Sequence, residues 1–398
     1  MANDLDPSIK EQWSMDYQDV AEKANVFSNF CNFRYESDLR VGDTVHRPYI
    51  SDVEVNTLGS EGQYTRQDIS STDETLVIDT EKEASFYIKK IDEFQSHYPT
   101  REKFARQCGI KLMNHVDGVC LGQVVNADSY VDAGDVGGSA GSPITLSTSN
   151  VDKVFTAAGR KLEQLDNDLS ERRFATIIPY FKQILLDSLA GRETALGDST
   201  GINGHCGKRF DFELFQTNAA YWVGILGMAT QPTANDTVTI NGVAFKFVAS
   251  PSAAGDVDLG ADVDGTRANL EAAINGGSGA GTAYIEVSSA NRKKLKDITA
   301  TNNDTTNKLT VVAYGRGYVA VEEGLTAAGD VWDSEVAHLL WGQGRPVDAV
   351  IQKAPEILLK DRDGYIGKDV VNYLVFGKKT FRDGKRRMVD VRINTAVI

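Results

Sequence analysis

LRVGDTVHRPYI (residues 39–50) and ETLVIDTEKEASFYIKKI (74–91) are two β-rich runs that flank a polar link, SDVEVNTLGSEGQYTRQDISSTD (51–73). Apolar and polar residues alternate in both runs, which is the period of a strand. The link is too long for a tight turn and too rich in β-compatible residues for a disordered loop. The stretch therefore predicts a two-stranded ribbon over about residues 40–80.

The tip and the partner of this ribbon follow from its composition. Gly59 and Gly62 lie in the middle of the link, where they allow the chain to bend. An isolated two-stranded ribbon is marginally stable in water, so we expect it to lie against a neighbouring subunit. An ordinary hairpin that folds onto its own domain is the alternative. The candidate residues for contact with a neighbour are Arg40, Arg47, Tyr49, Tyr64 and Arg66.

A long helical pattern follows over residues 98–125 and predicts a spine helix. An apolar stripe recurs at every fourth residue: Phe104, Cys108, Leu112, Val116 and Cys120. Gly109, Gly118 and Gly122 are unfavourable inside a helix, each by about 1 kcal/mol relative to Ala. They indicate either the close approach of another element or a break in the helix.

Helices and strands then alternate up to residue 228. A helix is predicted to begin after Ser149 or Asn150, and a strand over residues 174–178 leads to Pro179, a residue suited to the first position of a helix. A further strand is expected in KRFDFELFQT (208–217). The pattern predicts a mixed α/β domain.

The composition changes at about residue 229. DTVTINGVAFKFVA (236–249) predicts a hairpin around Asn241 and Gly242, the pair favoured in a type I′ turn. The block that follows is poor in basic and aromatic residues and rich in Gly, Ala, Thr and Asn. We interpret residues 229–320 as a small, separately folded insertion domain.

The fold class predicted from this order of elements is α+β. The predicted divisions are an N-terminal arm (1–28), an extended hairpin with peripheral strands (29–95), a spine-helix region (96–135), a first axial part (136–228), the insertion domain (229–320), an axial return (321–346) and C-terminal strands (347–398).

Composition and charge exclude several classes of protein. The 398 residues are 41% hydrophobic and 25% charged, which suits two or three globular domains. The sequence has neither the run of about 18–20 apolar residues that a membrane helix needs nor the features of a secretion signal, so we expect a protein kept in the cytoplasm. A net charge of −14 with scattered basic residues argues against sequence-specific binding of nucleic acid.

The motifs that resemble catalytic or binding sites are all incomplete. GINGHCGKR (201–209) resembles part of a phosphate-binding loop, but Ile202 and Arg209 replace residues that such a loop requires. The aspartates of DVDLGADVDG (256–265) and DRDG (361–364) lack the glutamate of a calcium-binding loop. The four cysteines and five histidines form no cluster with the spacing of metal ligands. We therefore predict no catalytic activity, no cofactor and no metal.

Five runs carry a resemblance to a known family: VGDTVHRPYISDVEVNTL (41–58), YTRQDISSTDETLVIDTEKEASFYIKKIDEFQ (64–95), INGHCGKRFDFELFQTN (202–218), VDAVIQK (347–353) and VVNYLVFGKKTF (370–381). In their order they resemble the extended loop, the strands and the closing segments of the major capsid protein of tailed bacteriophages. Its shell fold is shared with herpesvirus floor domains and encapsulins. Residues 236–317 are similar to insertion domains found in some of these capsid proteins, and the whole resemblance spans about residues 25–395.

The resemblance implies a shell protein that forms hexamers and pentamers, and from them an icosahedral head enclosing double-stranded DNA. The implied partners are further copies of the chain, a portal, decoration proteins and, because few residues precede the ribbon, a separate scaffolding protein. The implied location is the virion capsid after assembly in the host cytoplasm. The alternatives are an encapsulin-like compartment with an enzyme cargo and a soluble enzyme with an unrecognised site.

Overall fold

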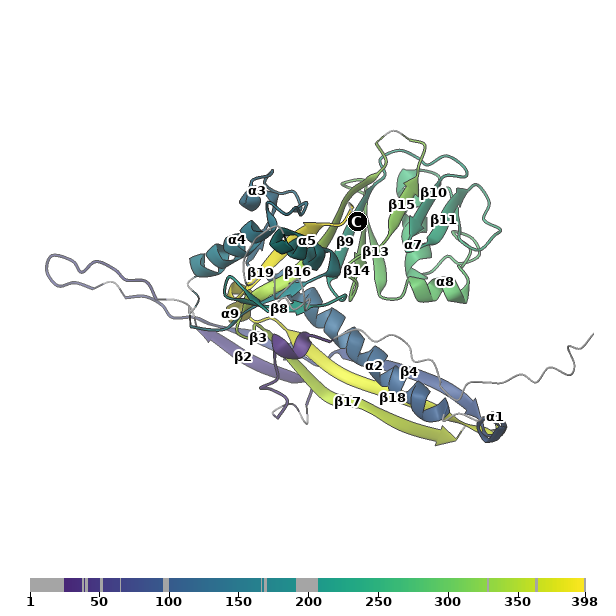
Figure 1. Ribbon diagram of the computed structural model, residues 1–398, viewed down its shortest axis with the longest axis horizontal. Helices are drawn as coiled ribbons and strands as arrows, with labels where there is room; N and C mark the ends of the chain where they lie inside the picture. Colours follow the sequence, from purple (N-terminus) through teal and green to yellow (C-terminus); the bar gives the residue numbers. More distant parts are fainter. Residues whose placement is uncertain are drawn as a thin grey trace, which may run out of the picture.

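The computed structural model describes residues 25–37, 39, 42–50, 53–64, 66–95, 100–165, 167, 170–190, 207–327, 329–361 and 364–396. Figure 1 shows a long sheet with a helix lying along it at the base, and a second sheet covered by helices above it. A block of strands and helices stands beside the second sheet, and a loop projects from one end of the base.

The base sheet has four strands in the order β1-β17-β18-β4. Their bounds are β1 Cys31–Asn32, β17 Val347–Asp361, β18 Gly367–Lys379 and β4 Thr80–Lys89; the short helices η2 (Phe27–Asn29) and α1 (Lys90–Gln95) precede β1 and follow β4. β17 and β18 form a long antiparallel hairpin, and β4 pairs antiparallel with β18. The closing strands thus pair with a strand that packs against the spine helix.

The spine helix α2 (Thr100–Leu121) is continuous and leads into the 3-10 helix η4 (Gly122–Asn126). It lies along the base sheet (Figure 1). The last three residues of the predicted stripe are buried: Leu112, Val116 and Cys120. Phe104, at the start of the stripe, is 41% exposed. Its ring lies beside Phe86 of β4, with 5.7 Å between the centroids.

Nine strands form the second sheet, in the order β13-β14-β9-β16-β6-β8-β7, with β19 paired to β16 and β5 paired to β19. The strands are β5 Ser129–Val131, β6 Arg173–Ile177, β7 Lys208–Arg209, β8 Phe212–Gln216, β9 Tyr221–Gly227, β13 Ile298–Asn303, β14 Lys308–Ala313, β16 Trp332–Gln343 and β19 Met388–Asn394. The helices around it are α3 Ala133–Val136, α4 Val151–Gln164, α5 Pro179–Ala190 and α9 Arg382–Arg386. The predicted mixed α/β arrangement is confirmed.

An aromatic cluster packs α4 and α5 onto this sheet. The rings of Phe155 on α4 and Phe181 on α5 lie 4.7 and 5.7 Å from that of Trp341 on β16. All three side chains are buried. The indole nitrogen of Trp341 donates to the carbonyl oxygen of Thr176 at 2.8 Å, so the N–H is satisfied inside the core.

The block beside the sheet begins with the predicted hairpin. β10 (Thr237–Ile240) and β11 (Val243–Val248) pair antiparallel, and the turn residues Asn241 and Gly242 have φ of 51° and 71°, as a type I′ turn requires. The other elements of the block are β12 Asp256–Asp258, α7 Val263–Asn275, α8 Ser289–Lys294 and β15 Val321–Gly324. Its strands form a separate sheet in the order β12-β11-β10-β15.

This block is not closed off from the rest of the chain. Between α8 and β15, the chain adds β13 and β14 to the nine-stranded sheet through β9. Residues predicted as one insertion (229–320) therefore contribute strands to two sheets, and their apolar side chains share one buried cluster with those of α4 and α5. Strand alternation is the same whichever sheet a hairpin joins, so the sequence pattern did not reveal this.

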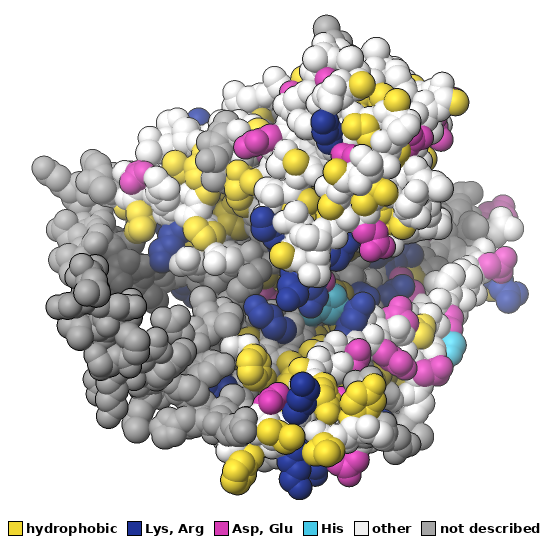
Figure 2. Space-filling view, turned by 90° about the vertical axis from the view of Figure 1, so that its right-hand side faces the viewer, with side chains coloured by type: hydrophobic (Ala, Val, Ile, Leu, Met, Phe, Trp, Pro, Cys, Tyr) yellow, Lys and Arg dark blue, Asp and Glu magenta, His cyan; other side chains and the backbone are white. Residues whose placement is uncertain are grey.

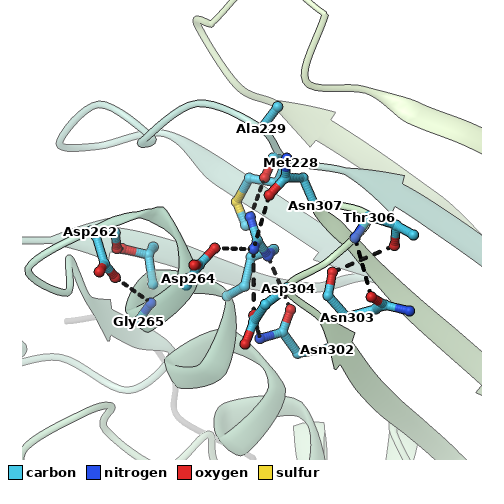
Figure 3. A network of polar contacts seen from close by, with 12 residues as sticks. Met228, Ala229, Asp262, Asp264, Gly265, Asn302, Asn303, Asp304, Thr306 and Asn307 are labelled. Carbon is cyan, nitrogen blue, oxygen red and sulfur yellow. Dashed lines mark hydrogen bonds and ion pairs between the residues drawn. The ribbon is translucent and has the colours of Figure 1, made fainter.

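Arg267 on α7 is fully buried and links this helix to the nine-stranded sheet. Figure 3 shows its partners Met228, Asp264, Asn302 and Asp304 close together. Its guanidinium donates to the carbonyl oxygen of Met228, just after β9, at 2.6 Å, and to Oδ1 of Asn302 on β13 at 3.0 Å. It also pairs with Asp264 and lies 3.4 Å from a carboxylate oxygen of Asp304. Because a buried charge is tolerated only when its hydrogen bonds are satisfied, these contacts fix α7 against the β13–β14 turn.

The glycines of the spine helix mark where this block approaches it. A methyl group at Gly118 would lie 2.7 Å from the Cα of Gly315, in the segment that follows β14. At Gly122 it would lie 2.9 Å from the ring of Tyr314. At Gly109, by contrast, no described atom beyond the adjoining residues and the backbone of the same helix lies within 4 Å of that position. Of the two readings left open by the sequence, close approach is therefore correct at Gly118 and Gly122.

We expect Gly118→Ala and Gly109→Ala to change stability in opposite directions. Alanine at Gly118 meets backbone that must shift, a cost of about 1–3 kcal/mol. Alanine at Gly109 meets open space and restricts the unfolded chain, which adds up to about 1 kcal/mol. Urea unfolding of both variants measures the difference. Equal effects at the two sites would contradict the close contact between α2 and Gly315.

Candidate assembly surfaces

The projecting loop joins β2 (Thr44–Ile50) to β3 (Ser71–Val77), which pair antiparallel from Thr44 opposite Val77 to Ile50 opposite Ser71. Figure 1 shows the loop extending well beyond the body of the molecule. The predicted ribbon with an extended tip is therefore present.

Gly59 and Gly62 form the turn at the tip. The Gly62 nitrogen donates to the Gly59 carbonyl oxygen at 2.9 Å, and Gly62 has a φ of 77°, a value that favours glycine. Nearer the body, the side chain of Gln67 bonds both the nitrogen and the carbonyl oxygen of Glu54, at 2.9 and 2.5 Å. These bonds hold the two arms of the loop together, while a hinge at the glycines stays a prediction.

The loop carries a set of exposed apolar side chains, each at least 64% exposed: Ile50, Val53, Val55, Leu58, Tyr64 and Ile69. The predicted contact residue Arg66 is exposed on the same loop. Single exposed apolar residues are common, but such a group on one projecting segment marks an interaction surface.

The base of the ribbon is fastened to its own chain. Arg47 donates two hydrogen bonds to the carboxylate of Asp383 on α9, at 2.9 and 2.7 Å. Burial raises the pKa of Asp383, but the bonds from Arg47 outweigh it and hold that pKa below its ordinary value. The ring of Tyr49 lies 4.5 Å from the guanidinium of Arg382. Contact of Arg47 and Tyr49 with a neighbour stays a prediction, and Arg40 lies outside the described residues.

A second apolar surface lies at the opposite end of the base, around α1 and the turn between β17 and β18 (Figure 1). Its side chains are between 55% and 90% exposed: Ile91, Phe94, Ile357, Tyr365 and Ile366. Figure 2 shows apolar side chains gathered on the lower lobe. This surface was not predicted from the sequence, although three consecutive apolar residues at 357–359 indicated a strand without a polar face.

Asp348 on β17 fastens β1 to the base sheet. Its carboxylate is buried, accepts a hydrogen bond from the side-chain amide of Asn32 at 2.9 Å and lies 3.3 Å from Nε of Arg34. Burial raises the pKa of Asp348 to about 6, although the charges of Arg34 and Arg47 act in the opposite direction. At neutral pH the fold therefore holds a carboxylate whose charged form it disfavours.

We expect Asp348→Asn to weaken the pH dependence of stability between about pH 4 and pH 6. The folded state binds the proton of Asp348 more tightly than the unfolded state, so the free energy of unfolding falls as pH rises through this window. The loss attributable to this group is on the order of 2 kcal/mol. Urea unfolding across this range tests it, with exposed Asp79→Asn as the control. If the free energy of unfolding fell with pH as steeply in Asp348→Asn as in the wild type, this pH dependence could not be assigned to Asp348.

The sequence motifs that resemble binding sites have structural roles in the part of the chain that the structure describes. Asp262 caps α7 by accepting a hydrogen bond from the Gly265 nitrogen at 2.8 Å. Bonds from the backbone nitrogens of Ser252 and Ala253 hold the pKa of Asp256 below its ordinary value. Among the described residues, no group of three or more His, Cys, Asp or Glu is placed to hold a metal ion. Residues 201–206 of the phosphate-loop-like run lie outside the description.

No described helix is both long enough and apolar enough to cross a membrane. Of the cysteines, Cys31 and Cys120 are buried and Cys108 is partly buried, all three as free thiols. Burial, with the adjacent Cys120 thiol, raises the pKa of Cys31 well above its ordinary value. These thiols therefore behave as small apolar side chains of the core.

Three solved structures resemble the chain over almost its whole length. A structure from Mycobacterium phage Che8 has a TM-score of 0.58 at 16% identity and covers 96% of each chain. The capsid of Cyanophage P-SCSP1u has a TM-score of 0.52 at 12% identity, over 98% of this chain and 94% of that one. The mature capsid of bacteriophage PhiM1 has a TM-score of 0.51 at 12% identity, over 97% and 92%. This chain has the phage capsid shell fold.

The capsid shell fold confirms the predicted fold class. No protein-family model matches the sequence, and no curated protein matches it. The similarity therefore lies in the arrangement of elements and not in the residues that build them. Within this fold, the projecting loop and the apolar end at α1 each present a group of exposed apolar side chains.

Proposed function

We propose that the chain is a phage major capsid protein, which assembles through hexamers and pentamers into an icosahedral shell around double-stranded DNA. The observation that carries this proposal is the projecting loop, which exposes six large apolar side chains on a chain with the capsid shell fold. A monomer gains nothing from such a loop, whereas a subunit in a shell buries it.

The energetics of the loop support assembly. Burying a large apolar side chain contributes about 1.5–3 kcal/mol, so the set on the loop can offset much of the entropy lost on association. Stable interfaces bury on the order of 1,200–2,000 Å² in total, and one subunit of a shell takes part in several. Weak contacts repeated around a closed shell reinforce one another through effective concentration.

The two ends of the base sheet have separate roles in this proposal. The loop lies across an adjacent subunit, and the glycines at its tip let it bend differently in hexamers and pentamers. The apolar end around Phe94 and Tyr365, exposed by 90% and 59%, is covered where neighbouring capsomers meet. A scaffolding protein and a portal complete the head, and the chain has a structural role and not a catalytic one.

Negative-stain microscopy of the purified chain tests assembly. We expect closed particles, or rings of five and six subunits that close into particles when a scaffolding protein is supplied. A small soluble species under both conditions would count against a shell. Nuclease protection of particles from lysed host cells then separates a DNA-filled head from a compartment with enzyme cargo, the second candidate. The phage origin of the similar structures favours the head.

A further inference from the structure

A basic cleft of about 570 Å³ lies between α2 and the block that follows β9. Figure 2 shows lysine and arginine side chains gathering in the hollow between the upper and lower lobes. Lys111 on α2 forms one wall of the cleft; Lys293 and Lys296, at the end of α8, and Arg316, after β14, form the other. The chain as a whole carries a net charge of −14, so this concentration of cations runs against its overall charge.

The residues that line this cleft carry more positive than negative charges. Asp297 is the acidic residue of the lining, against the four cations Lys111, Lys293, Lys296 and Arg316. It lies 3.4 Å from Nδ1 of His115, and this pairing outweighs burial and holds the pKa of Asp297 below its ordinary value. The lining therefore carries four cationic side chains against one carboxylate, an excess of about three positive charges that an anionic partner would offset.

The floor of the cleft also holds a buried hydrogen-bond acceptor. The side-chain oxygen Oδ1 of Asn114 is buried and has no hydrogen-bond partner among the residues that the structure describes, a costly state for a buried polar atom. A phosphodiester offers acceptors and no N–H group along its backbone. A peptide offers a backbone N–H beside each side chain. Four cations around a buried acceptor thus fit an acidic peptide better than a phosphate chain.

The chain supplies an acidic peptide whose attachment point is beside the cleft. Residues 1–24 contain six acidic residues (Asp4, Asp6, Glu11, Asp16, Asp19 and Glu22) and two basic ones (Lys10 and Lys23), a net of −4 from side chains. The backbone nitrogens of Val26 and Phe27 donate to Oδ1 of Asp117 on α2, at 2.9 and 2.8 Å. Asp117 immediately precedes Gly118, which lines the cleft.

We propose that the acidic N-terminal segment binds the basic cleft of its own subunit, with Asp16, Asp19 and Glu22 facing Lys111, Lys293 and Lys296. These carboxylates precede Asn25 by three to nine residues. At up to about 3.3 Å per extended residue, they reach as far as about 30 Å from the attachment point. The inference concerns the single subunit and stands apart from the proposed shell function, so the unassembled chain is the material for its test.

Carbodiimide cross-linking of the full chain tests the proposal directly, because this reagent joins a carboxylate to an amine only when the two are in contact. We expect peptides that link Asp16, Asp19 or Glu22 to Lys111, Lys293 or Lys296. These links should disappear in Asp16→Asn/Asp19→Asn/Glu22→Gln. An equal mixture of ¹⁴N- and ¹⁵N-labelled chains should give links within one label only. Links of these carboxylates to other lysines, or links that mix labels, would overturn the proposal.

Tryptic cleavage after Lys23 gives an independent readout. Charge reversal in the cleft, Lys293→Glu/Lys296→Glu, is expected to speed this cleavage about tenfold at low salt, as for the loss of two or three exposed ion pairs. The matched control, Lys82→Glu/Lys153→Glu, reverses two exposed lysines outside the cleft and should leave the rate unchanged. Equal rates in cleft and control variants would overturn the proposal.

A nucleic-acid partner is the competing outcome. Acetylation of the full chain, read by mass spectrometry, reports the accessibility of Lys293 and Lys296 with and without a 20-nucleotide single strand. In our proposal the two lysines are shielded without the oligonucleotide and become reactive in the variant with neutral residues at 16, 19 and 22. Shielding by the oligonucleotide alone, independent of those residues, would assign the cleft to nucleic acid instead.

Discussion

Deletion of residues 55–70 is expected to leave a folded chain that forms no closed particles. The deletion removes most of the exposed apolar side chains of the loop, each worth about 1.5–3 kcal/mol when buried against a neighbour. It is also compatible with the fold. Ile50 and Ser71 lie opposite each other in the β2–β3 ribbon, and the four remaining residues, 51–54, can close a hairpin of ordinary length.

Size-exclusion chromatography and negative-stain microscopy measure the result, and thermal unfolding checks that the body is intact. A milder variant makes the test specific: Val55→Ser/Leu58→Ser/Tyr64→Ser/Ile69→Ser should also abolish particles. The matched control changes four polar residues of the same loop, Asn56→Ser/Glu61→Ser/Gln63→Ser/Asp68→Ser, and should still assemble. Normal particles from the deletion would refute the assembly role of the loop.

Arg267→Met is expected to destabilise the block beside the nine-stranded sheet by about 3 kcal/mol. Methionine fills much of the volume but donates no hydrogen bond, so the carbonyl of Met228 and the amide of Asn302 lose their partner in a buried setting. The carboxylates of Asp264 and Asp304 are about half exposed or more and regain water, which keeps the cost below that of a fully buried ion pair.

Hydrogen exchange locates the effect of this substitution. We expect faster exchange in α7, β13 and β14, and little change in β17 and β18 of the base sheet. Lys308→Met is the control, because the Lys308–Asp333 pair is partly exposed at 3.0 Å and its loss should cost at most about 1 kcal/mol. If Arg267→Met lost no more stability than Lys308→Met, the hydrogen bonds and ion pairs of Arg267 would not be what holds α7 to the sheet.

Local sequence patterns were sufficient to predict most of the helices, strands and turns. The Asn241–Gly242 turn, the start of α5 at Pro179 and the helix after Asn150 were all predicted, because each depends on residues within a few positions of one another. The ribbon of β2 and β3 was predicted for the same reason. The contact roles of Tyr64 and Arg66 stay predictions, because one chain does not show what covers an exposed residue.

Contacts between segments that are distant in the sequence could not be predicted from its local pattern. Gly118 gave a signal, a poor helix former inside a helix, but its partner Gly315 lies almost 200 positions away. The apolar end around Phe94 and Tyr365 combines two segments that are likewise distant in sequence. Which lysines and arginines converge in one cleft depends on how α8 is placed above α2, and periodicity carries no information on that placement.

The two-stranded ribbon and its long link were determined by the sequence alone, because alternation and turn composition act over neighbouring residues. The tertiary structure decided that Arg47 and Tyr49 fasten the ribbon to α9 while the apolar tip stays uncovered. It also decided that β13 and β14 join the nine-stranded sheet, since the choice of a strand's partner depends on side-chain packing and satisfied buried groups such as Arg267, across residues far apart in the chain.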